Sequence, residues 1–332
     1  MTRKSIALAT FTAVALVLTA LAAAVAFGGP APIAPLASIN QPFANVDFSA
    51  VPRASRFQAR DGTALSWHRY PAAGAATPAR RVVLVHGSSA RGRSMHVLAQ
   101  GLAAAGFEVA ALDMRGHGDS GPRGQAGYIG QLEDDVEDFM RAVPHAGPST
   151  LLGFSSGGGF VLRFAGGSRQ ALFDRYVLLA PYLRFDAPTA RPDNGGWASV
   201  GVARLVGLQL LNKAGIAAFN HLPVLNFGLD DEARKFLTPS YSYTLAASFG
   251  PHHDYLGDIR GARGVLHIVA GKDDELFHAD RFAGVFADAE KPVTVTLVAG
   301  TNHMGLTLQD AAVRAVVQVI SGAAQEPQAR LP

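Results

Sequence analysis

The regular alternation of short apolar segments with longer helical ones most constrains the fold. Patterns typical of buried strands occur at residues 82–85, 109–112, 151–154, 176–179, 265–270 and 293–298. Helical patterns lie between or after them, for example at about 94–105 and about 308–320. Strands that alternate with helices form a mostly parallel sheet with helices on both faces. The chain is therefore predicted to be an α/β protein whose ligands bind beyond the carboxyl ends of the strands.

Two segments depart from this alternation. RFQARDGTALSWHRY, residues 56–70, has two short alternating runs around Asp61-Gly62, which predicts a hairpin at an antiparallel edge of the sheet. Residues 184–257 separate two predicted strands and are largely helical where they show a period. An insertion of this kind lies at one end of the sheet, so it is predicted to be a cap over the ligand-binding edge. Its apolar part, Trp197 to Phe219, either attaches the cap to the core or faces an acyl chain or a bilayer.

The N-terminus predicts transport across a membrane. MTRK is basic, and Ser5 to Phe27 is apolar apart from small Ser and Thr residues. Such a segment is typical of a secretory signal peptide or a single membrane anchor, so both remain open for residues 1–27. The length favours a span, whereas Ala24-Val25-Ala26 is a plausible cleavage site. In either case the basic end stays in the cytoplasm and the rest of the chain crosses, to be membrane-anchored or secreted.

The segments at either side of the predicted folded domain have little pattern. Residues 28–54 are rich in Pro, Ala and Gly and are predicted to be a linker. The folded domain is expected at 55–322, and residues 323–332 are expected to be a C-terminal tail. Within the domain, the acidic run Glu133 to Asp138 alternates with Leu132, Val136 and Phe139, and is interpreted as the solvated face of a helix.

Composition argues against several classes of function. The formal charge of the 332 residues is only +3, and no dense Lys/Arg cluster is present, which disfavours a nucleic-acid partner. The chain has no cysteine, so disulfides and thiolate metal sites are excluded. His252-His253-Asp254 superficially resembles a metal cluster, but adjacent side chains rarely point at one ion, so it is interpreted as a surface loop.

A candidate nucleophile lies in Gly153-Phe154-Ser155-Ser156-Gly157, which fits G-x-S-x-G. A predicted strand precedes the motif and a predicted helix follows it, as in a nucleophile elbow. Residues two before and two after the nucleophile crowd each other, so glycine is needed at both places. Ser155 has glycine at both, whereas Ser156 has Phe154 at one. Ser155 is therefore the candidate nucleophile, and Ser156 would contribute its backbone N–H.

A serine nucleophile needs a base, and the base needs a group that orients it. His303, in GTNHMGL, follows the last predicted strand and is the candidate base. Asp273, Asp274 and Glu275, in GKDDELF, follow the preceding strand, and spacing alone does not choose among them.

The tetrahedral intermediate needs hydrogen-bond donors for its oxyanion. HGSS, residues 86–89, follows the first parallel strand, and Gly87 lets the backbone approach closely. The N–H groups of Ser88 and Ser156 are the predicted donors.

Together these motifs resemble the α/β-hydrolase superfamily, and within it the bacterial lysophospholipase and monoacylglycerol-lipase-like group, which includes proteins described as serine aminopeptidases. The resemblance covers about residues 55–322 and rests, in order, on HGSS, DMRGHGDS at 113–120, GFSSGG, GKDDELF and NHMGL. It implies the α/β-hydrolase fold with a helical cap insertion. The family's spacing of Gly, two residues and the acid favours Asp274 over Asp273.

The resemblance also implies structural rather than chemical roles for part of the motif set. In the loop at 113–120 these residues are Asp113, Arg115 and Gly116. His117 and His86 are interpreted as structural too. The chain departs from its relatives in carrying Ser-Ser after HG, which leaves the contacts to the acyl group open.

The implied function is a serine hydrolase that cleaves carboxylic esters through Ser155, His303 and Asp274, with an acyl-enzyme intermediate and without a metal or organic cofactor. A lipid-like ester, such as a monoacylglycerol or lysophospholipid, is the expected substrate. Two alternatives remain open. A serine aminopeptidase would need an acidic group in the cap, for which Asp230 and Glu232 are the candidates. A hydrolase-like binding protein would have an occluded site.

Overall fold

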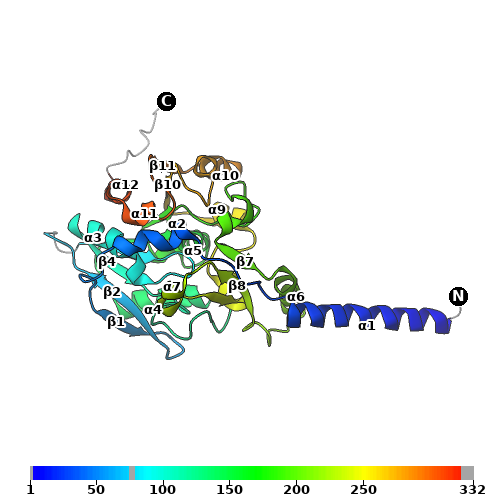
Figure 1. The fold of residues 1–332 in the computed structure, drawn as a ribbon. Coiled ribbons are helices and arrows are strands. Elements are labelled where there is room, and N and C mark those ends of the chain that lie inside the picture. Colours follow the sequence, from blue (N-terminus) through cyan, green and yellow to red (C-terminus); the bar gives the residue numbers. More distant parts are fainter. Residues whose placement is uncertain (1–2, 75–78, 323–332) are drawn as a thin grey trace.

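The computed structural model describes residues 3–74 and 79–322, so the predicted tail at 323–332 lies outside the described residues (Figure 1). At its centre is an eight-stranded sheet in the order β1-β2-β4-β3-β5-β6-β10-β11. The strands are β1 (Ala54–Gln58), β2 (Ala64–Tyr70), β3 (Arg80–Val85), β4 (Phe107–Leu112), β5 (Ser149–Phe154), β6 (Arg175–Leu179), β10 (Val265–Gly271) and β11 (Thr294–Val298). β1 and β2 pair antiparallel, β2 joins β4 antiparallel, and all later pairs are parallel. The mostly parallel sheet and its antiparallel hairpin edge are as predicted.

Helices cover both faces of this sheet. β5 is buried at every position, which requires a covering layer on each side. α3 and α12 pack against each other, and α5 packs against α9. The helices are η2 (Gly92–Met95), α3 (His96–Ala104), α4 (Gln131–Ala142), α5 (Ser156–Gly166), η3 (Gln170–Leu172), α9 (Tyr255–Gly261), η5 (Ala279–Arg281), α10 (Phe282–Asp288), α11 (Gly305–Leu308) and α12 (Asp310–Ser321).

The insertion between β6 and β10 contains helices, as the sequence predicts, but it also contains a three-stranded antiparallel sheet, β7-β8-β9, which the sequence does not predict. Its elements are η4 (Pro192–Gly196), β7 (Ala198–Val200), α6 (Val202–Lys213), β8 (Pro223–Phe227), α7 (Asp231–Phe236), β9 (Ser240–Ser242) and α8 (Tyr243–Ser248). Strands of three to five residues offer too few positions for a period of two to be recognised. We call residues 184–248 the cap, because α9 belongs to the helical layer over the central sheet.

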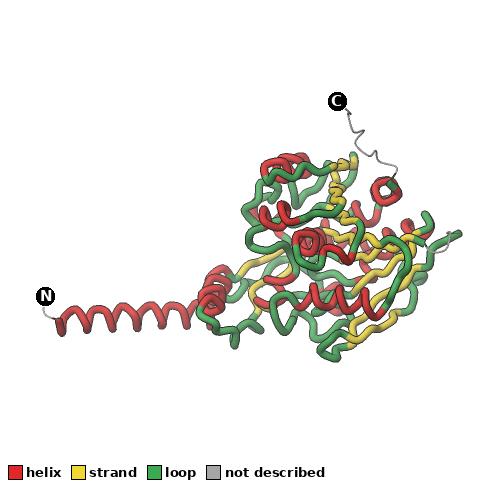
Figure 2. Tube along the Cα trace, turned by 180° about the vertical axis from the view of Figure 1, so that it is seen from behind, coloured by secondary structure: helices red, strands yellow, loops and turns green. Residues whose placement is uncertain are grey.

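The N-terminal helix α1 (Arg3–Phe27) projects from the body of the molecule (Figures 1 and 2). Within the described part of the chain it alone is long and apolar enough to cross a membrane. Its last turns pack on α6: Val25 is buried with Leu208, and a Cβ on Gly207 would lie 3.0 Å from the Val25 side chain. Arg204 donates hydrogen bonds to the carbonyls of Val25 and Ala26, each at 2.8 Å, and so caps the C-terminus of α1.

The segment 28–54, expected to be a linker, has structure of its own. It contains α2 (Ala37–Asn40) and η1 (Gln41–Asn45) and lies along the cap. The Leu36 N–H and the Asn40 side-chain amide donate to the carbonyl of Gly228, at 2.9 and 2.8 Å. Phe43 packs against the main hydrophobic core. Tertiary contacts order this segment, since its own composition has no helical period.

The acidic run in α4, expected to face solvent, is mostly buried instead. Glu133 pairs with Arg163 at 2.5 Å, and Asp135 pairs with Arg115 at 2.7 Å. The arginines come from elements distant in the sequence, so periodicity along α4 gives no sign of them. The Arg115–Asp135 pair ties the 113–120 loop to α4, in agreement with a structural role for Arg115.

Candidate active site

Ser155 lies in the turn between β5 and α5 with φ 54° and ψ −119°, a left-handed conformation that costs energy for a side chain with a Cβ. The flanking glycines permit this turn. A Cβ on Gly153 would lie 2.1 Å from the Gly157 carbonyl oxygen, and a Cβ on Gly157 would lie 2.2 Å from the His86 carbonyl oxygen. The backbone therefore has the nucleophile elbow that the G-x-S-x-G spacing predicts.

His303 and Asp274 meet beyond the ends of β11 and β10. The His303 Nδ1 lies 2.8 Å from the Asp274 Oδ2, and both side chains are buried. The other Asp274 oxygen accepts the backbone N–H groups of Leu276 and Phe277, at 2.8 and 2.9 Å. Burial alone would raise the pKa of Asp274, but the neighbouring His303 charge and these hydrogen bonds outweigh it and lower the pKa. The carboxylate thus stays ionised beside the imidazole.

The other two acids of this loop occupy different positions. Asp273 is exposed to solvent. One carboxylate oxygen of Glu275 accepts the backbone N–H of His303 at 3.0 Å, which fixes the loop rather than the imidazole. Spacing left three acids open as the partner of His303. In the structure, it is Asp274 whose carboxylate contacts the histidine ring.

Ser155 and His303 line the same cavity. Among the hydrogen bonds of the described residues, none joins the Ser155 hydroxyl to His303. Such bonds are often long in a substrate-free site and shorten when substrate binds. The rings of Phe154 and Phe277 pack on the imidazole with centroids 4.7 and 5.2 Å away, which restricts its orientation.

The predicted oxyanion donors are available. In the described chain, no protein hydrogen bond uses the backbone N–H of Ser88 or Ser156. The cap holds the loop that carries Ser88: Trp197 Nε1 donates to the Ser88 hydroxyl at 2.8 Å, and the Ser89 N–H donates to the Tyr241 hydroxyl at 2.5 Å. Sequence reasoning missed Trp197 and Tyr241, because only the fold brings the cap strands to this loop.

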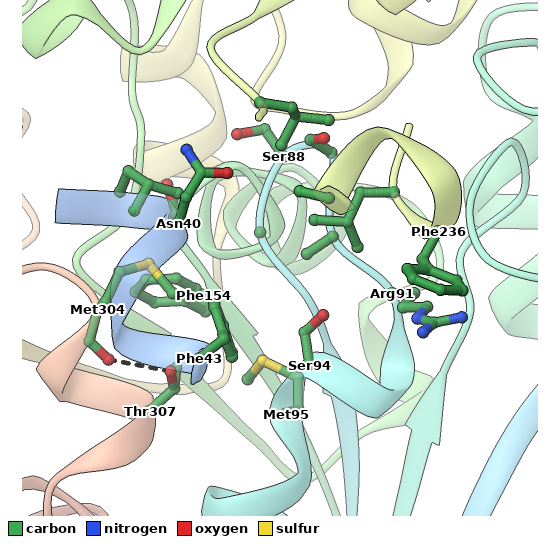
Figure 3. Close-up of a pocket in the computed structure, with 18 of the residues that line it drawn as sticks. Asn40, Phe43, Ser88, Arg91, Ser94, Met95, Phe154, Phe236, Met304 and Thr307 are labelled. Carbon is green, nitrogen blue, oxygen red and sulfur yellow. Dashed lines mark hydrogen bonds between the residues drawn. The ribbon is translucent and has the colours of Figure 1, made fainter. Parts of the chain in front are cut away.

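A cavity of about 480 Å³ joins these groups (Figure 3). The N-terminal segment lines it with Ile39, Asn40, Phe43, Ala44 and Phe48. Sequence reasoning missed this wall. The available signal was the pair of phenylalanines in a segment otherwise typical of a linker.

The remaining histidines of interest lie outside the cavity lining. His86 is fully buried; its Nδ1–H donates to the Gly87 carbonyl at 2.8 Å, and its Nε2 accepts the Met114 N–H at 3.2 Å. Burial lowers the pKa of His86 to about 4, so it is neutral near pH 7. His117 Nε2 lies 2.6 Å from the Tyr241 hydroxyl. These contacts agree with structural roles for both.

The loop at 252–254 also has structural contacts. The His252 Nδ1 lies 2.6 Å from the Asp258 carboxylate. Asp254 caps α9 by accepting the Gly257 N–H at 2.9 Å. Both contacts fit a loop that begins a helix.

Part of the chain is similar to known hydrolases. Residues 76–227 match the family described as serine aminopeptidase, S33. The chain is 44% identical over 94 residues to a monoacylglycerol lipase of Mycolicibacterium smegmatis, a match that covers 26% of this chain and 32% of that protein. The chain thus matches about a third of the length of this curated relative.

Solved structures share the fold at low sequence identity. A soluble variant of monoglyceride lipase from Saccharomyces cerevisiae has a TM-score of 0.62 and 18% identity, over 84% of this chain and 97% of that one. A membrane phospholipase A described as a bacterial virulence factor has a TM-score of 0.55 and 16% identity, over 98% of this chain and 100% of that one. The chain therefore has the α/β-hydrolase fold, and parts of it are similar to a monoacylglycerol lipase and to the serine aminopeptidase S33 family.

Proposed function

We propose that the protein is a serine hydrolase that cleaves carboxylic esters of lipid-like substrates, such as monoacylglycerols or lysophospholipids. One observation carries the proposal: a single cavity is lined by the serine of a strained elbow, Ser155, and by His303, whose ring is held by a buried carboxylate. This combination matches the requirements of nucleophilic catalysis by a hydroxyl group.

In the proposed mechanism, the Ser155 hydroxyl attacks the ester carbonyl while His303 accepts its proton. Asp274 holds the Nδ1–H of the ring, which leaves Nε2 as the base, and its ionised carboxylate stabilises the imidazolium that forms. The N–H groups of Ser88 and Ser156 donate to the oxyanion; one such donor typically contributes about 10²–10³ in rate. His303 then protonates the leaving alcohol and activates a water that releases the acid.

The lining of the cavity supports the proposal that the substrate carries an apolar acyl group. Most of its lining is hydrophobic, with aromatic and thioether side chains from separate parts of the chain: Phe43, Phe48, Met95, Phe154, Trp197, Phe236 and Met304. Flexible methionines and aromatic rings suit a chain of variable conformation. The similarity to a monoacylglycerol lipase is consistent with this class of substrate.

The surface around α1 supports attachment to a membrane. α6, on which α1 docks, exposes Val202, Val206 and Leu210 at 61, 47 and 53%. These residues are four apart and so form one stripe along the helix. A helix that spans the bilayer brings this stripe to the interface, where the stripe can bury its apolar surface. Arg3 and Lys4, in the first turn of α1, favour a catalytic domain outside the cytoplasm.

The same contacts favour a retained anchor over a cleaved signal. The plausible cleavage site at 24–26 is packed on α6, and Arg204 holds its last two carbonyls. A protease would have to act before this interface forms. Mass spectrometry of the mature N-terminus distinguishes the two: an intact Arg3 region supports an anchor, and a new terminus near residue 27 contradicts it.

One observation favours a second candidate function, that of an aminopeptidase. Asp230 and Glu232 of the cap both line the cavity. Each already has a partner, since Asp230 caps α7 by accepting the Ala233 N–H at 2.7 Å and Glu232 pairs with Lys235 at 2.5 Å. We rank this candidate second because both carboxylates already have partners within the cap.

The test combines an active-site probe with substrate panels. A fluorophosphonate should label the wild type but not Ser155→Ala, whereas a folded, unlabelled wild type would indicate a binding protein. p-Nitrophenyl esters of increasing chain length should be cleaved with a preference for longer chains. Cleavage of aminoacyl anilides without ester hydrolysis would instead support the peptidase.

A further inference from the structure

Two arginines beside the candidate reaction centre have no acidic partner. Arg91 and Arg93 line the cavity and are partly buried. Within residues 3–74 and 79–322, neither forms an ion pair. The Arg91 guanidinium stacks over the Phe236 ring, 5.4 Å from its centroid, and makes no protein hydrogen bond in the same part of the chain. Arg93 stacks over Phe48 at 4.8 Å and donates one long bond, 3.5 Å, to the Phe48 carbonyl.

Three neighbouring carboxylates have other partners, and the exposed Asp119 acts on Arg91 through its charge without an ion pair in the described residues. Asp230 and Glu232, also in the cavity wall, cap α7 and pair with Lys235. Asp113 accepts the backbone N–H groups of Gly92 and Asp119, at 2.7 and 3.0 Å. These acids therefore leave the donors of Arg91 free to bind a ligand. Burial, the largest influence, lowers the pKa of Arg91, although an arginine stays protonated at neutral pH. A bound anion would offset the cost of burying this charge.

We propose that Arg91 and Arg93 form an anion subsite that binds the phosphate of a lysophospholipid-type substrate while Ser155 attacks its acyl ester. The inference rests on the proposed function, and it narrows the substrate from lipid-like esters in general to those with an anionic headgroup. The Arg91 guanidinium lies over the Phe236 ring and makes no hydrogen bond within the described residues, so its N–H donors are available, and a guanidinium can match two phosphate oxygens.

The arrangement of the cavity fits such a substrate. Figure 3 shows Arg91 and Phe236 on one side of the pocket, Phe43, Phe154 and Met304 on the other, and Ser88 at the upper edge of the view. Arg91 is only three residues from Ser88, so their Cα atoms are at most about 11 Å apart. In a lysophospholipid the acyl chain and the phosphate likewise extend to opposite sides of the ester.

The test uses the full chain in neutral detergent micelles with two ligand pairs. The ester pair is 1-palmitoylglycerol and its 3-phosphate, compared by kcat/KM. The ether pair is 1-O-hexadecylglycerol and its 3-phosphate, which cannot be hydrolysed and are compared by calorimetric affinity. The variants are Arg91→Met, Arg91→Lys and, as a control with the same loss of charge on an exposed face, Arg56→Met.

The wild type should prefer the phosphate in both pairs. Arg91→Met should reduce that preference about 10- to 100-fold, the usual range for a hydrogen bond to a charged group, and Arg91→Lys should retain part of it. Arg56→Met should keep the wild-type preference. An unchanged preference in Arg91→Met, or an equal affinity of the wild type for the two ethers, would overturn the subsite.

Two further outcomes distinguish an error in the proposed function from an error in the assigned ligand of the subsite. If neither ester is cleaved, the proposed function fails, but the ether pair still decides whether the subsite exists. If inorganic phosphate displaces the ether phosphate at concentrations near the affinity of the latter, the site binds free phosphate, and the lipid headgroup assignment is wrong.

Discussion

The floor and the roof of the cavity are built in different ways. The floor consists of turns at the carboxyl ends of β5, β10 and β11, and it carries Ser155, Asp274 and His303. Glycine contacts and buried hydrogen bonds fix these turns. The roof combines residues 39–48, Trp197 and the short helix α7. Behind it, the cap and the end of α1 share a small second core of Val25, Leu208, Val224 and Tyr243. Under the proposed function, the floor would fix the chemistry and the roof would select the substrate.

The largest effect should come from the floor. Ser155→Ala should lower kcat for p-nitrophenyl esters by about 10⁴-fold or more, because Ser155, with the positive φ and a glycine two residues away on each side, is the candidate nucleophile of the elbow. Ser156→Ala is the matched control; it keeps the backbone N–H and should change kcat less than about threefold. A large loss of kcat in Ser156→Ala with little loss in Ser155→Ala would show that the assignment of Ser155 as the nucleophile is wrong. Thermal melts check that both variants are folded.

The buried acid should come next. Asp274→Asn should lower kcat by roughly 10³–10⁴-fold, because an amide no longer holds the imidazole in the tautomer that exposes Nε2 as a base. Asp273→Asn, on the exposed neighbour, should stay within about twofold of the wild type. Equal losses in the two variants would contradict the assignment of Asp274.

The roof should give smaller effects on chemistry. Trp197→Phe removes the hydrogen bond to the Ser88 hydroxyl but keeps an aromatic ring, so the oxyanion loop loses one tether. A net hydrogen bond of about 1 kcal/mol corresponds to roughly a fivefold loss in kcat/KM. Steady-state kinetics on a short-chain ester provide the measurement. A loss as large as that of Asp274→Asn would mean that the roof, too, fixes the chemistry.

Phe43→Ala should separate substrate binding from chemistry. Truncation of this wall should raise KM for long-chain esters several-fold and leave kcat/KM for an acetyl ester nearly unchanged, since a short acyl group does not reach it. Esters of two to sixteen carbons provide the series. An equal effect at all chain lengths would show that the N-terminal segment does not select the acyl chain.

The smallest effect concerns stability against pH. Because burial lowers the pKa of His86 to about 4, the unfolded chain, with an ordinary pKa near 6.5, binds a proton that the folded protein does not. Stability from this group is therefore complete above about pH 6.5 and falls as the pH drops towards 4. The melting temperature should decline over this window, and His86→Asn should flatten the decline. A constant melting temperature from pH 7 to 4.5 would contradict this.

Sequence patterns anticipated the floor but not the roof. The parallel sheet and the positions of Ser155 and His303 follow from local signals: apolar runs, a glycine on each side of the turn, and polar residues just after strands. The roof has no such signal. Strands β7 to β9 are too short to show a period, and residues 28–54 are ordered by contacts with the cap. The prediction that the acidic face of α4 is exposed to solvent was wrong for a related reason. The arginines that pair with its carboxylates lie elsewhere in the chain.

The sequence by itself determined the α/β architecture and the order of the candidate catalytic residues, because hydrophobic period and glycine spacing act over a few residues. Only the tertiary structure decided that Asp274 rather than Asp273 meets His303, that the N-terminal segment lines the cavity, and that α1 docks on α6. Each of these depends on contacts between residues far apart in the chain. Such contacts produce no periodic pattern in the sequence of either segment that makes them.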